Sequence, residues 1–192
     1  MITTEGQKKI IAAFFEVAAT VGDTDKITIK MIADQVGIRR ESIYKYHFRN
    51  IDEIINHIHN LIDKEVFERF KYHTIDKGGD AVWFLTYEFL PVLYEKREWL
   101  KILYSTKVDP SWMEFLVNRY VPIIKEYLDL NNKNEPIHNL YLSKIVVKEF
   151  LSIVSTWLTH DEPESLASFQ KKFLYLLKLS PYSILSQEIS EG

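Results

Sequence analysis

The chain of 192 residues contains no cysteine. It therefore lacks the thiols of a disulfide framework and the thiolates of a zinc site, and this absence fits a reducing compartment. Residues 1–7 have neither the basic start nor the long apolar run of a signal peptide, and no later segment approaches the ~20 apolar residues that span a bilayer. The sequence predicts a cytoplasmic protein with no membrane contact.

Motifs of common catalytic sites are absent as well. The chain has no Gly-rich phosphate loop, no H-E-x-x-H, no G-x-S-x-G and no thiol nucleophile. His57 and His59 are two residues apart, so on a helix they point about 200° away from each other and cannot bind one metal ion together. We expect no catalytic residue, no metal site, no cofactor and no enzymatic activity.

Positive charge is concentrated in one short segment. The whole chain carries a net charge of −3, whereas residues 26–50 contain six cations and only two anions. Phosphate binding depends on the charge of the contacting face rather than on that of the whole chain. The segment therefore fits a nucleic-acid contact, and the alternative is an ordinary solvated face of charged side chains.

Hydrophobic periodicity predicts helices over nearly the whole chain, which places it in the all-α class. The first three helices are expected at residues 5–21, 29–36 and 39–47. Thr28 can cap the second helix, and Gly37 suits its C-terminus because glycine adopts a positive φ without a Cβ penalty. Two short helices joined by a tight glycine turn, the second opening with arginines, are typical of a DNA-binding helix-turn-helix.

A long fourth helix is expected at residues 51–72, with Asn50 as N-cap and Glu53 as its capping-box partner. Residues 77–80, Lys-Gly-Gly-Asp, form the clearest break in the chain. The sequence therefore predicts a helix-turn-helix domain at residues 1–50, a linking helix at 51–72 and a larger helical domain at 73–192.

The N-terminal pattern resembles the TetR family of bacterial transcription regulators over residues 5–60. The resemblance rests on the capped second helix, the glycine turn, Ser42-Ile43-Tyr44 in the short third helix, and His-Phe-Arg-Asn-Ile-Asp-Glu-Ile-Ile at residues 47–55. It implies a regulator, in most cases a repressor, that binds a palindromic double-stranded DNA operator as a homodimer and is released by a small hydrophobic or aromatic effector. Activators of the family share the same N-terminal DNA-binding domain.

The resemblance also implies which residues contact DNA. Base edges would be read from the start of the third helix, and phosphates would be contacted by residues around it. The expected DNA-binding residues are Thr28, Lys30, Arg39, Arg40, Glu41, Ser42, Tyr44, Lys45 and His47.

Two departures from the family pattern occur near the end of this motif. Three residues separate Tyr44 from Phe48 where the family usually has two, so either Tyr46 or His47 takes the place near the DNA backbone. Ile51 stands where the family usually has a lysine. These departures support a competing hypothesis, a helical small-molecule-binding or interaction protein that has lost DNA binding.

The C-terminal region is rich in aromatic residues and is expected to form helices near residues 79–95, 97–106, 110–130, 137–160 and 163–178. Tyr and Trp carry polar groups that a plain core avoids, so their density favours a cavity for an apolar or aromatic ligand. The alternative is a core built from large side chains. The expected wall residues are Trp83, Tyr87, Tyr104, Trp112, Tyr120 and Phe150.

Two apolar stripes lie on the last two expected helices. One small domain cannot easily cover both stripes, and the family resemblance implies that they form a four-helix interface between two subunits. Ordinary packing within one chain is the alternative. The expected interface residues are Val147, Leu151, Val154, Leu158, Phe169, Phe173 and Leu177.

Overall fold

The computed structural model describes residues 3–105, 107–131, 136–180 and 183–184. Within these ranges the regular secondary structure is helical, apart from one isolated bridge between Asp23 and Lys107. The all-α prediction is confirmed. The helices in chain order are α1 (Glu5–Val21), η1 (Thr24–Lys26), α2 (Ile29–Val36), α3 (Arg40–Tyr46), α4 (Ile51–Lys71), η2 (Tyr72–Asp76), α5 (Ala81–Phe84), η3 (Leu85–Phe89), α6 (Leu90–Glu95), α7 (Arg97–Ser105), α8 (Trp112–Asn131), α9 (Asn139–Thr159) and α10 (Leu166–Leu176).

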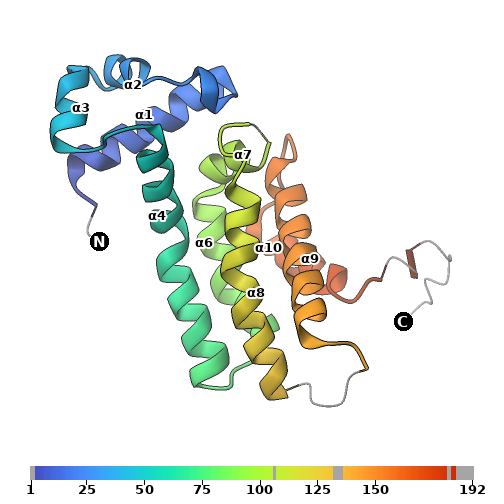
Figure 1. Ribbon diagram of the computed structural model, residues 1–192. Coiled ribbons are helices and arrows are strands. Elements are labelled where there is room, and N and C mark those ends of the chain that lie inside the picture. Colours follow the sequence, from blue (N-terminus) through green and yellow to red (C-terminus); the bar gives the residue numbers. More distant parts are fainter. Residues whose placement is uncertain (1–2, 106, 132–135, 181–182, 185–192) are drawn as a thin grey trace.

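Helices α1, α2 and α3 form a head at the upper left of Figure 1, above the start of α4. The Thr28 hydroxyl accepts a hydrogen bond from the Met31 amide and so caps α2, as the sequence predicts. Gly37 ends α2 with a φ of 77°, and its amide donates to the Ala33 carbonyl. Ile43 of α3 is fully buried within the head. The glycine turn and this buried side chain together fix the orientation of α3 relative to α1 and α2.

Helix α4 joins the head to the rest of the molecule. The Asn50 side chain accepts a hydrogen bond from the Glu53 amide, which begins the helix where the sequence predicts. Ile54, Ile58 and Ile62 are buried one turn apart, so one face of α4 packs inward along its length. At about 1.5 Å per residue the 21 residues of α4 span roughly 30 Å, which is long enough to link the head to the rest of the molecule.

The segment expected as one helix at residues 79–95 is divided in the structure. It consists of α5, the π-helical turn η3 and α6, and Pro91 lies in the first turn of α6. Proline has no amide hydrogen, and its ring clashes with the carbonyl four residues before it. The Leu90 amide instead donates to the Leu85 carbonyl, five residues back, and this wider turn precedes the proline.

The two apolar stripes near the C-terminus are covered from within the same chain. Val147, Leu151, Val154 and Leu158 are buried on α9, which packs along α8, and Phe169 and Phe173 are buried on α10, which packs on α6 and η3. The Trp157 and Phe169 rings stack with centroids 3.9 Å apart. The expectation that these side chains face a second subunit is therefore corrected: six of the seven are buried in the core, and Leu177 is half-buried against it.

Candidate functional site

The residues expected to contact DNA gather on the outer side of α2 and α3. Thr28 and Lys30 are exposed at the start of α2, and of the predicted residues on the α3 segment Arg39, Arg40, Glu41, Tyr44 and Lys45 are exposed. Ser42 and His47 are half-buried. Because Ile43 is buried on the opposite side of the same short helix, α3 presents a polar, cationic face to solvent.

The start of α3 lies one residue later than expected. Arg39 is the N-cap, with an extended backbone and no capping hydrogen bond from its side chain, and the helix begins at Arg40. Arg40 Nε donates to Glu41 Oε1 at 2.9 Å, and this hydrogen bond lowers the pKa of the Glu41 carboxyl. Both side chains are exposed, and exposed ion pairs contribute little free energy, so this pair can separate when either group meets another partner.

Tyr46 and His47 differ sharply in their surroundings. Tyr46 is 66% exposed, with the Lys45 ammonium 5.1 Å from its ring centroid. The His47 ring lies against the start of α1, so close to Gly6 that a Cβ there would come within 2.4 Å of His47 Cε1. The Tyr46 side chain is thus free toward solvent, whereas the His47 ring is held by the head itself.

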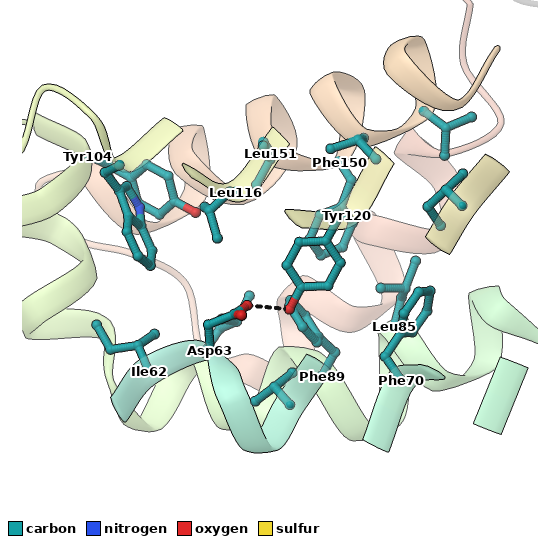
Figure 2. Close-up of a pocket in the computed structure, with 16 residues that line it drawn as sticks. Ile62, Asp63, Phe70, Leu85, Phe89, Tyr104, Leu116, Tyr120, Phe150 and Leu151 are labelled. Carbon is teal, nitrogen blue, oxygen red and sulfur yellow. Dashed lines mark hydrogen bonds between the residues drawn. The ribbon is translucent and has the colours of Figure 1, made fainter. Parts of the chain in front are cut away.

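A second feature is a cavity among the helices of the C-terminal region, shown in Figure 2. The cavity volume is about 50 Å³, and all space between atoms in this region, open solvent included, amounts to about 650 Å³. It is lined by Ile62, Asp63, Val66, Phe70, Leu85, Phe89, Leu93, Tyr104, Trp112, Leu116, Tyr120, Ile124, Val146, Val147, Phe150 and Leu151.

Four of the six residues expected to line a pocket are in this wall: Tyr104, Trp112, Tyr120 and Phe150. Trp83 and Tyr87 are not, and this corrects the expectation for both. They lie about half-exposed on the outer side of α5 and η3, where the Trp83 ring stacks on His73. Phe84, one position after Trp83, and Phe89, two positions after Tyr87, are buried instead, so a different set of aromatic side chains faces inward from this segment.

Asp63 is the charged residue of the cavity wall and was not among the predicted residues. Its carboxylate is 4% exposed and accepts hydrogen bonds from the Tyr120 hydroxyl at 2.6 Å and from Arg119 Nε at 2.9 Å. The Arg119 guanidinium also lies over the Phe67 ring, 3.6 Å from its centroid. Burial, together with the Asp63 charge, raises the pKa of Tyr120 well above its usual range, so the hydroxyl remains a donor.

One feature of the sequence could have pointed to Asp63 as a buried functional residue. It follows Ile62 on a helix whose apolar stripe faces inward, and a carboxylate next to such a stripe must find a partner when it is buried. That partner, Arg119, is 56 residues away in the chain, so only the fold shows that the charge is compensated.

Another polar group of the wall is Trp112, which is 1% exposed. Its indole Nε1 is buried without a hydrogen-bond partner among the described residues. Tyr104 is its neighbour, with ring centroids 6.2 Å apart. Burial raises the pKa of the Tyr104 hydroxyl above its usual range, and the Trp112 indole N–H, which lies near this hydroxyl without a hydrogen bond of normal geometry, partly opposes the shift.

The loop before α8 connects the head to the cavity wall. Thr24, in the head, donates its hydroxyl to the carbonyls of Lys107 and Val108, and the Lys107 amide donates to the Gly22 carbonyl at 3.1 Å. One residue further, Asp109 pairs with His59 of α4. Trp112 begins α8 three residues after Asp109, so head, α4 and cavity wall meet at this loop.

In the buried pair of Asp109 and His59, the charge state of Asp109 is defined. Burial raises the pKa of the Asp109 carboxyl, but the hydrogen bonds from His59 and Ser111 outweigh burial and hold this pKa below its ordinary value. Asp109 is therefore an anion at neutral pH, and it ties α4 to the loop before α8.

The described part of the chain contains neither a cluster of metal-binding side chains nor a helix that could span a membrane. No group of three or more His, Cys, Asp or Glu side chains is placed there to hold a metal ion. None of the described helices is both long and apolar enough to cross a membrane.

Comparison with known proteins yields a likeness of fold. No family model matches the sequence, and no curated protein matches it. The crystal structure of NalD from Pseudomonas aeruginosa, described as the secondary repressor of the MexAB-OprM multidrug efflux pump, is similar with a TM-score of 0.72 and 16% sequence identity. The match covers 90% of this chain and 94% of that chain. The chain therefore has a TetR-like fold, with an N-terminal helix-turn-helix and a C-terminal helical domain.

Proposed function

We propose that this chain is a ligand-responsive transcriptional regulator. It acts as a repressor that binds a palindromic double-stranded DNA operator as a homodimer and leaves it when a small hydrophobic or aromatic molecule occupies the cavity. The observation that carries the proposal is the exposed cationic face of α3, held out from the head by the buried Ile43. The likeness to a repressor of known structure supports it.

The residues of this face have different roles in the proposal. Arg40, in the first turn of α3, reads a base edge, because an arginine side chain suits the two acceptors of guanine in the major groove. Its ion pair with Glu41 opens on contact with DNA, which frees the Glu41 carboxylate to accept from cytosine. Lys30 and Lys45 bind phosphates, together with the Thr28 and Tyr44 hydroxyls, and fix the register of the head.

Of the two candidates near the DNA backbone, we assign the contact to Tyr46. Its side chain is the exposed one, whereas the His47 ring packs against Gly6. Ile51, which stands at the family's lysine position, is half-buried against the core and cannot reach a phosphate, and the exposed Arg49 replaces it.

The homodimer in this proposal uses surface residues rather than the two buried stripes. Large apolar side chains remain exposed on the first half of α9, where Tyr141 is 62% and Ile145 is 46% exposed. These two residues lie one helical turn apart and share a face. A second copy of the chain would cover them and hold two α3 helices at about one turn of DNA, roughly 34 Å.

In this proposal the effector signal passes from the cavity wall to the head through α4 and the loop before α8. The cavity wall includes Ile62 and Asp63 of α4, and the head lies at the start of that same helix. One turn before Asp63, His59 binds Asp109 of the loop that also holds Thr24 of the head. A ligand that shifts α4 against this loop would change the angle of the head, which is a population shift between two arrangements.

A gel-shift titration with the DNA that flanks the gene for this chain tests the proposal. We expect a shift that weakens as salt rises, and Arg40→Ala should lower affinity for the operator more than affinity for random DNA. A protein without salt-sensitive binding would instead be a helical small-molecule-binding protein. Equal loss on both DNAs would remove the base-reading role of Arg40 and leave the DNA-binding role of the head intact.

A further inference from the structure

The polar groups of the cavity wall define which chemistry a ligand must carry. Of the sixteen lining residues, Asp63, Tyr104, Trp112 and Tyr120 bear polar atoms, and the others are aliphatic or phenylalanine. Asp63 and Tyr120 bind each other, and Asp63 also accepts from Arg119. Their hydrogen-bonding needs are thus largely met within the protein. The Trp112 indole N–H is buried and lies near the Tyr104 hydroxyl, but it makes no hydrogen bond of normal distance and angle among the described residues.

A buried, unpaired donor costs free energy, and a ligand that supplies an acceptor recovers that cost. Trp112 is 1% exposed, so the acceptor must come from inside the cavity rather than from bulk solvent. The Tyr104 ring lies beside it, and Figure 2 shows the Tyr104 hydroxyl turned toward the interior near Leu116, apart from the hydrogen bond between Asp63 and Tyr120. A donor and a hydroxyl therefore stand side by side at one end of an apolar space.

The charge of the wall excludes two ligand classes. An anion would meet the Asp63 carboxylate, and no lysine or arginine is among the lining residues to balance it. An ammonium group would have to leave water for a nearly apolar space, where the Asp63 charge is already compensated by Arg119. Neutral molecules avoid both costs.

We propose that the cavity selects a small neutral molecule with an apolar ring and one hydrogen-bond acceptor, such as a ketone oxygen, which takes the Trp112 indole N–H beside the Tyr104 hydroxyl. This inference rests on the proposed effector cavity. It adds the class of ligand and the residue that selects it.

Four compounds of one skeleton test the selection. Ethylbenzene has no acceptor, acetophenone has a neutral one, phenylacetate is an anion, and 1-phenylethylamine is a cation at neutral pH. We expect acetophenone to bind the full-length protein about tenfold more tightly than ethylbenzene, since one hydrogen bond to a buried donor is gained. The two charged compounds should bind more weakly than ethylbenzene in isothermal titration.

Substitution at the donor provides the control. Trp112→Phe should remove the preference for acetophenone over ethylbenzene, and Trp99→Phe should keep it, because Trp99 stacks on Phe15 and is not part of the cavity wall. Should Trp112→Phe not fold, the indole N–H signal of Trp112 in a ¹⁵N-labelled wild-type protein replaces it. That signal should move downfield with acetophenone but not with ethylbenzene.

The outcomes distinguish failure of the ligand-class proposal from failure of the proposed effector cavity. If none of the four compounds binds, the cavity takes no ligand of this size and the effector proposal fails as well. If ethylbenzene binds as tightly as acetophenone, or if Trp112→Phe keeps the preference, the cavity binds ligands but Trp112 does not select them. Tighter binding of phenylacetate or 1-phenylethylamine would overturn the proposed neutral class.

Discussion

Removal of the Tyr120 hydroxyl is the most direct test of the polar edge of the cavity. In Tyr120→Phe the ring remains, so no packing volume is lost, but Asp63 Oδ1 loses a donor at 2.6 Å. Asp63 is 4% exposed, so water does not readily replace that donor. Hydrogen bonds to charged groups contribute about 1.5–3 kcal/mol, and we therefore expect the free energy of unfolding to fall by about 2 kcal/mol.

For a chain of this size, a loss of about 2 kcal/mol lowers the melting temperature by roughly 4–8 °C. Thermal unfolding followed by circular dichroism at one fixed protein concentration measures this shift. Tyr175→Phe is the matched control, because Tyr175 is 54% exposed. The melting temperature of this variant should stay within about 1–2 °C of that of the wild type. A melting temperature for Tyr120→Phe equal to that of the control would refute the reasoning.

A double-mutant cycle assigns the loss to the charge of Asp63. In an Asp63→Asn background the acceptor is neutral, and neutral hydrogen bonds contribute about 1 kcal/mol. Tyr120→Phe should therefore cost about half as much in that background as in the wild type. An equal cost in both backgrounds would show that the hydroxyl acts through packing rather than through the carboxylate.

Three other predictions concern the head, the junction and the surface. Lys45→Ala should reduce the slope of log affinity for DNA against log salt by about one, whereas Lys148→Ala on α9 should leave it unchanged. Because the folded protein holds the pKa of Asp109 below the ordinary value of 3.8, its carboxylate contributes stability that is complete above pH 3.8 and is lost as the pH falls further. Acid unfolding of Asp109→Asn should therefore depend less steeply on pH below 3.8 than that of the wild type. Ile145→Glu should shift the protein from dimer to monomer in sedimentation velocity at an unchanged helical content, and a dimer that persists would place the interface elsewhere.

The head could be predicted from sequence almost residue by residue because its signals are local. Thr28, Gly37 and Asn50 each act on the one or two turns next to them, and their hydrogen bonds follow from backbone geometry alone. The third helix was expected one residue early because Arg39 offers no capping side chain to mark the boundary. Whether these exposed side chains contact DNA is a property of a complex, and it stays a prediction.

The C-terminal region was predicted less well because its arrangement depends on contacts distant in sequence. Its apolar periodicity identified α9 and α10 but not their partners: Trp157 stacks on Phe169 twelve residues later, which covers both stripes within one chain. Trp83 and Tyr87 lie four residues apart on the exposed face of this segment, whereas Phe84 and Phe89 are buried, and an aromatic count does not show which face turns inward. The π-helical turn before Pro91 also divides the expected helix. Periodicity at 3.6 residues per turn cannot anticipate a local turn of another period.

The buried aspartates and the buried histidine of the described part of the chain are grouped at one junction, and their location bears on how a ligand would act. Within the described part of the chain, His59, Asp63 and Asp109 are buried where α4, the loop before α8 and the cavity wall meet. Buried ion pairs seldom stabilise a fold more than well-packed apolar side chains of the same volume would. What such pairs provide is a defined geometry, since each has only a few arrangements that satisfy all its hydrogen bonds. A ligand that moves Asp63 by a fraction of a hydrogen-bond length would therefore favour a second arrangement of this junction, and the loop that holds Thr24 would carry that change to the head.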